Sequence, residues 1–143
     1  MALQYSTTLR NAQLDQIETT IGTSPKLFLY SGTVPANCAA VDASGQLAMI
    51  TMPSDWASAA SGGVKQLLGT ITGTGAAAGN AASFRIKDSS ATTTANTGTT
   101  HMQGTVTATG GGGDITLDNV NIAIGQTITI NSGAGTGVTA GNA

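Results

Sequence analysis

The sequence predicts a mainly-β fold, an antiparallel β-sandwich or jelly-roll-like domain, with one N-terminal α-helix and a short helical turn near residues 54–60. Three observations support this prediction. Only 8% of the 143 residues are charged and only 3% are aromatic, so backbone ladders and small contacts must supply much of the order. From residue 26 onward, short alternating or β-branched segments are separated by turn residues. A single segment with helical periodicity precedes them.

That helix is expected over residues 7–21. Ser6 or Thr7 can cap its start, Gly22 provides a left-handed stop, and Pro25 follows shortly afterwards.

The helix carries an aliphatic stripe, because Leu14, Ile17 and Ile21 recur at spacings of three and four. These side chains are candidate core or partner contacts. The stripe either packs on the sheet of its own subunit or docks on a neighbouring molecule, and both interpretations stay open.

Period-two patterning then predicts a series of short strands. They are expected at residues 26–31, 47–52, 64–72, 82–87, 101–108, 114–118 and 126–131. Gly110 to Gly113 is expected to be a hairpin loop, and residues 88–100 a long, exposed polar loop.

Residues 53–60 are expected to form a brief helical turn, capped by Ser54 or Asp55 and stopped by Gly62 and Gly63. The turn contains Trp56, the only tryptophan. A tryptophan in this setting is more often a core or lid residue than a binding platform.

The length fits one domain, residues 1–143. Residues 1–25 would form a helical segment packed on or beside the sheet, and residues 26–131 a β-rich core. Residues 132–143 would form a Gly-rich tail, either a mobile end or a strand lent to a neighbour.

Composition and charge argue against several classes of partner. The five Lys and Arg residues are scattered, with no basic stripe for a nucleic acid. No apolar run approaches membrane-spanning length. Cys38 is the only cysteine, so no intrachain disulfide can form, which fits assembly in a reducing cytoplasm.

Candidate chemical motifs are weak. The glycines from Gly73 to Gly79 resemble a dinucleotide loop, but a strand-like segment follows them where that loop needs a helix. Asp114 and Asp118 suggest one unrepeated calcium motif, which could not stack into a β-helix. His101 has no second zinc ligand apart from the distant Cys38. We therefore expect no enzyme activity, no cofactor and no metal.

Several stretches of the chain do resemble a known class of protein. They are YSTTLRNAQLDQIE, IGTSPKL, PANCAA, GTITGTGAAAGNAASFRIKDS, HMQGTVTATGGGGDITLDN and the ending TAGNA, which together cover most of the sequence. In these stretches the chain resembles small structural proteins of tailed bacteriophages and prophages.

The resemblance implies a protein of the virion, assembled in the host cytoplasm. Within that class, head-decoration or cement proteins are similarly small, β-rich and oligomeric. The implied partners are the major capsid protein and further copies of the chain, with a trimer as the expected assembly, and neither nucleic acid nor membrane. The alternative is a tail or fibre-associated module for host attachment, although such modules use aromatic clusters to stack on sugars, and this chain has five aromatic residues.

Overall fold

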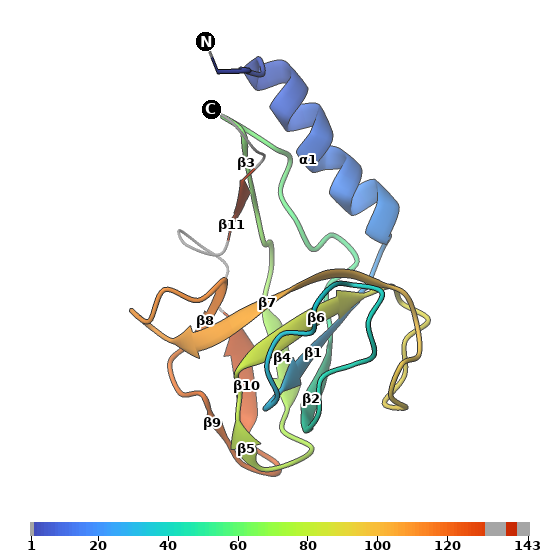
Figure 1. The fold of residues 1–143 in the computed structure, drawn as a ribbon, viewed down its shortest axis with the longest axis vertical. Coiled ribbons are helices and arrows are strands. Elements are labelled where there is room, and N and C mark those ends of the chain that lie inside the picture. Colours follow the sequence, from blue (N-terminus) through green and yellow to red (C-terminus); the bar gives the residue numbers. More distant parts are fainter. Residues whose placement is uncertain (1, 131–136, 140–143) are drawn as a thin grey trace.

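The structure, a computed structural model, describes residues 2–130 and 137–139. Its described part is mainly strand with a single helix, α1 (Thr7–Ile21), as the sequence predicts (Figure 1). The described strands are β1 (Lys26–Tyr30), β2 (Gln46–Thr51), β3 (Val64–Gln66), β4 (Ile71–Thr74), β5 (Gly79–Asn80), β6 (Ser83–Lys87), β7 (Thr100–Ala108), β8 (Ile115–Leu117), β9 (Asn121–Ile122), β10 (Thr127–Ile130) and β11 (Gly137–Thr139).

A curled five-stranded sheet, in the order β2-β1-β6-β7-β8, forms the body of the molecule. The antiparallel pair β10-β4 lies across its open side, with β4 against β2 and β10 against β8. The main core fills the space between them. It includes Leu27 and Leu29 of β1, Phe84 and Ile86 of β6, and Ile128 of β10.

The central strands β1 and β6 are buried on both faces. Alternate residues of β6 point into the main core, whereas Arg85 and Lys87 point to the outer face of the sheet and are still only 2% and 1% exposed. Two long connections, residues 31–45 and 88–99, fold over that outer face. Beneath them lies a small second cluster formed with Phe28 and Tyr30.

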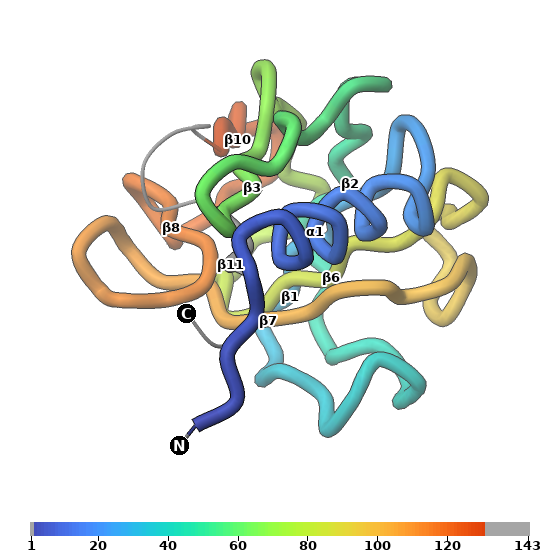
Figure 2. The backbone as a smooth tube through the Cα atoms, turned by 90° about the horizontal axis from the view of Figure 1, so that it is seen from above, coloured from blue at the N-terminus to red at the C-terminus, as the bar shows by residue number. Residues whose placement is uncertain are grey.

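Helix α1 begins and ends as its sequence predicts. The side chain of Ser6 accepts a hydrogen bond from the backbone N–H of Leu9, and the chain leaves the helix at Gly22 with φ of +85°. The helix runs alongside β3, and Figure 1 shows it, with β3 and β11, extending from the curled sheet. Figure 2 shows the molecule from above, with the helix nearest the viewer. We call α1, the segment 57–67 and β11 the arm.

The helical turn expected near residues 54–60 is wrong. This segment contains no helical residues: Ser54 and Asp55 lie in a bend, and Ala57 forms an antiparallel bridge with Leu67. Gly62 and Gly63, read from the sequence as a helix stop, instead form a hairpin turn with φ of +62° and +78°. Two consecutive positive φ values suit a tight hairpin and are unfavourable for residues with side chains.

Two other strand predictions also need correction. The segment 64–72 is not one strand, because the chain turns at Gly69 (φ of +77°) between β3 and β4. The loop at Gly110 to Gly113 does not make a hairpin, because β8 pairs parallel with β7. The sheet is therefore not purely antiparallel.

Residues 132–136 and 140–143 of the expected C-terminal tail lie outside the described residues, and so does residue 131 of the expected strand 126–131. The described part, β11, pairs antiparallel with β3 of the same chain. Among the described residues, no helix combines the length and apolar character needed to cross a bilayer.

Candidate functional site

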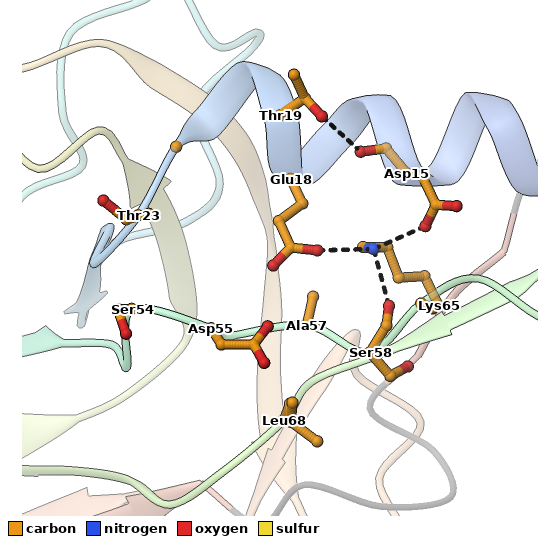
Figure 3. Close-up of a pocket in the computed structure, with 12 residues that line it drawn as sticks. Asp15, Glu18, Thr19, Thr23, Ser54, Asp55, Ala57, Ser58, Lys65 and Leu68 are labelled. Atoms are coloured by element: carbon orange, nitrogen blue, oxygen red, sulfur yellow. Dashed lines mark hydrogen bonds and ion pairs between the residues drawn. The ribbon is translucent and has the colours of Figure 1, made fainter.

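A cleft of about 630 Å³ lies between α1 and the segment that runs from Ser54 to Leu68 (Figure 3). Its charged lining consists of Asp15 and Glu18 from the helix, Asp55, and Lys65 from β3. Hydroxyl groups complete much of the remaining wall.

Lys65 is the buried charge of this cleft, with only 3% of its side chain exposed. Its Nζ lies 3.0 Å from Asp15 Oδ1 and 2.9 Å from Glu18 Oε2, and it donates a 2.8 Å hydrogen bond to the Ser58 carbonyl. Burial by itself lowers the pKa of Lys65, but the two carboxylates outweigh it and raise that pKa. The ammonium therefore holds the helix on the hairpin.

Further polar contacts bind the two halves of the arm. Asp15 accepts a 2.9 Å hydrogen bond from the Ala60 N–H, and this bond, followed by the one from Lys65, lowers the pKa of Asp15. Asn11 accepts a 2.9 Å bond from the N–H of Gly63. The charged groups of Asp15 and Lys65 therefore have a structural role, which is to hold the two halves of the arm together.

A second buried cluster lies under the loops on the outer face of the sheet. Asp42 Oδ1 lies 2.9 Å from Arg85 Nη1, and Asp42 Oδ2 lies 2.8 Å from Lys87 Nζ. Lys87 also lies over the ring of Phe28, 5.2 Å from its centroid. Asp42 and Asn96 exchange backbone and side-chain hydrogen bonds that join the two loops.

Burial alone would raise the pKa of Asp42. Hydrogen bonds from Lys87, the Asn96 N–H and Arg85 outweigh burial and lower that pKa. The hydroxyl of Tyr30 is buried without a hydrogen-bond partner, and burial followed by the charge of Asp42 raises its pKa. A pocket of about 490 Å³, lined by Arg85 and Lys87 among other residues, opens beside this cluster.

A third, mainly apolar groove of about 430 Å³ separates α1 from the start of β7. Gln13, Gln16 and Ile17 line its helical side, and His101 and Met102 line its strand side. Ile17 is half-buried here and packs against the main core.

The structure places the other residues of the aliphatic stripe inside the protein. Leu14 and Ile21 are 1% and 5% exposed. Trp56 is 1% exposed and belongs to the main core, where its indole N–H donates a 3.0 Å bond to the Gly22 carbonyl. Ile17, Ile21 and Trp56 thus lie where α1 meets the main core, whereas Leu14 is buried outside both core clusters.

The residues of the candidate chemical motifs do not lie together in one site. His101 lines the apolar groove, and Cys38 lines the pocket beside Arg85. Asp114 accepts hydrogen bonds from the N–H and hydroxyl of Thr105, which lower the pKa of Asp114. Asp118 accepts a hydrogen bond from the Thr109 hydroxyl. Nowhere in the described residues do three or more His, Cys, Asp or Glu side chains gather as metal ligands would.

The cluster of Asp42, Arg85 and Lys87 could not be predicted from the sequence. The available signal was the period-two spacing of Arg85 and Lys87 within a strand, which places both cations on one face. Asp42 lies in a loop 43 residues before Arg85 in sequence, and no local pattern links the two.

No protein-family model matches this chain, and no curated protein and no solved structure matches it either.

Proposed function

We propose that this chain is a structural protein of a tailed-bacteriophage virion. Its specific role would be a head-decoration or cement subunit that binds the outer capsid surface and stabilises contacts between capsomers. The curled sheet and the β4-β10 pair would then serve as a sandwich-like or jelly-roll-like body. The resemblance of the sequence stretches quoted above supports the class of protein, and the arm supports the role.

The arm is the observation that carries the proposal. Its helix has three charged residues, Arg10, Asp15 and Glu18, and Asp15 and Glu18 pair with Lys65. Another face of α1 carries an uncharged row at spacings of four, three and four, namely Leu9, Gln13, Gln16 and Thr20. We call this row the neutral stripe.

The neutral stripe suits a protein surface as its partner. Its four residues are exposed, and Leu9 is 46% exposed although it is aliphatic. The stripe continues into the apolar groove beside Met102. An uncharged surface can be buried without the desolvation cost that unpaired ions carry.

A cement role needs many modest contacts rather than one strong one. Each subunit would bind the major capsid protein and sister copies in a trimer, and repetition across the lattice would multiply weak contacts. The capsid surface supplies the many identical sites that this mechanism requires.

We also propose that the protein is not an enzyme. The buried cations Lys65, Arg85 and Lys87 each hold backbone carbonyls and carboxylates in place. Replacing His101 or Cys38 by Ala should leave particle assembly and infectivity intact. Loss of a catalysed reaction in a folded His101→Ala protein would contradict this part of the proposal.

The alternative is a tail or fibre-associated module for host attachment. Trp56, Phe28 and Tyr30, three of the five aromatic residues, are buried at 1% exposure each and cannot stack on a sugar. That observation favours the head over the tail.

The proposal is tested by adding the purified protein back to particles that lack it. Leu9→Asp places a charge in the neutral stripe at an exposed position, so the protein should fold normally and bind particles at least tenfold more weakly. Ile124→Asp is the matched control, because Ile124 is 74% exposed and lies outside the arm. Equal binding by both variants would contradict the role of the arm.

A further inference from the structure

We infer that the pocket beside Arg85 and Lys87 is a binding site for a carboxylate group. We call it the cationic pocket; its walls come from residues 38–42 and 96–100. The inference goes beyond the proposed function and does not depend on it.

The charge of the cluster around Asp42 favours an anion. Two cations, Arg85 and Lys87, are paired with one carboxylate, Asp42. The cations are 2% and 1% exposed, so water screens them poorly. Backbone carbonyls also accept their hydrogen bonds, but a carbonyl contributes a dipole and no net charge. One positive charge remains unbalanced within the cluster.

The other buried cation of the described residues shows the opposite balance. Lys65 is paired with two carboxylates, Asp15 and Glu18. An excess of positive charge is therefore a property of the outer-face cluster and not of buried lysines in this fold generally. A small anion would balance the cationic pocket and would be repelled by the cleft at Lys65.

Arg85 also has a hydrogen-bond donor without a partner. Arg85 Nη1 donates to the Ala40 carbonyl and Asp42, and Nη2 donates to the Asn37 carbonyl and Gln103. The Nε of Arg85 is buried and has no partner. A buried donor without an acceptor is costly, and a guanidinium prefers carboxylate oxygens as acceptors, so Arg85 keeps hydrogen-bonding capacity that Asp42 does not use.

The cationic pocket is also large enough for a ligand. The cationic pocket has a volume of about 490 Å³, within the usual range for small-molecule sites. A carboxylate occupies a small part of it. The occupant could therefore be a free small carboxylate or an acidic side chain carried by a partner protein, and both offer the same chemistry.

Thermal unfolding of the full chain tests the inference, with sodium acetate as the probe and sodium chloride at equal ionic strength as the reference. A ligand that binds only the folded state raises the midpoint in a saturable manner. At ten times the dissociation constant we expect a rise of about 3–6 °C over chloride. Identical midpoints in the two salts over the whole titration would overturn the inference.

Three variants locate the effect. Lys87→Met leaves Arg85 balanced by Asp42, so the saturable response to acetate should disappear. Lys65→Met is the matched control, since it also removes a buried lysine and should keep the response. Asp42→Asn should respond more strongly than the wild type, because acetate would replace the lost carboxylate. A response that survives Lys87→Met unchanged would overturn the assignment to this pocket.

Cys38 offers a chemical readout at the same place, because it lines the cationic pocket and is the only cysteine. Iodoacetate is anionic and iodoacetamide is neutral, and both alkylate a thiolate with release of iodide. Acetate should slow alkylation of Cys38 by iodoacetate at least fivefold more than alkylation by iodoacetamide. Equal slowing of both reagents would count against an anion site.

The source of the carboxylate is then distinguished with peptides. A short peptide with one central glutamate is compared with the same peptide carrying glutamine, both with blocked ends. Protection of Cys38 by the glutamate peptide alone supports a partner's acidic side chain, and protection by acetate but by neither peptide supports a free small carboxylate. Protection by none of the three overturns the inference.

Discussion

The indole Nε1 of Trp56 donates a 3.0 Å hydrogen bond to the carbonyl oxygen of Gly22, the residue at which α1 ends. This bond joins residues 34 positions apart and fixes the end of the helix to the main core. It also gives one of the last helical carbonyls a partner, which helix ends otherwise lack. The direction in which the arm leaves the body therefore depends on Trp56.

Trp56→Phe should destabilise the protein by about 2–4 kcal/mol. The substitution removes the bond to Gly22 and leaves a small cavity in a site that is 1% exposed. Chemical denaturation followed by circular dichroism measures the loss. An unchanged midpoint would mean that neither the bond nor the packing matters.

Ile17→Asp should destabilise the protein by about 2–3 kcal/mol, because a charge would enter a half-buried position that packs on the main core. Gln16→Asp is the matched control. It introduces the same residue one position earlier, at an exposed site, and should stay within about 0.5 kcal/mol of the wild type. Equal stability of the two variants would show that packing of Ile17 on the main core does not stabilise the protein.

Local signals explain which parts of the fold could be predicted from sequence. The bounds of α1 follow from its cap at Ser6 and its stop at Gly22, and the central strands follow from period-two patterning. The conformation of the segment 54–60 could not be predicted, because it depends on the bridge from Ala57 to Leu67.

The candidate sites were less predictable than the strands. The parallel pairing of β7 with β8 is a tertiary property, stabilised where Asp114 bonds Thr105 and Thr107 accepts a bond from Gly113. The joining of Asp42 to Lys87 likewise requires a long loop to fold back over the sheet. Nothing in the local sequence encodes either contact.

The two buried ion clusters should differ in their response to losing a partner. Asp42→Asn leaves two fully buried cations without a counter-charge and should cost about 3–5 kcal/mol. Lys65→Met should cost less, about 1–2 kcal/mol, because Asp15 and Glu18 are 50% and 28% exposed and can regain water. Urea denaturation of both variants in chloride buffer measures the difference. A larger loss for Lys65→Met would contradict this ranking.

Asp88 should make the stability depend on pH. The Ser90 hydroxyl, followed by the backbone N–H groups of Thr99 and Ser90, lowers the pKa of Asp88 from 3.8 to about 2. Because the pKa is lower in the folded state, the carboxylate stabilises the fold above pH 4, and this contribution is lost as the pH falls toward 2.

Asp88→Asn should therefore be less stable than the wild type at pH 7, and the difference should shrink between pH 4 and pH 2. Thermal unfolding across this range checks the prediction. A difference that stays constant down to pH 2 would show that Asp88 acts through its shape and not through its charge.

The most direct test of the proposed function is the position and copy number of the protein on purified phage particles. Cryo-electron microscopy of the particle, combined with quantitative mass spectrometry, measures both. We predict density for the protein on the outer head surface, in a copy number that follows the capsid lattice, with α1 at the contact. A few copies confined to the tail, or no copies on the particle, would contradict the decoration role.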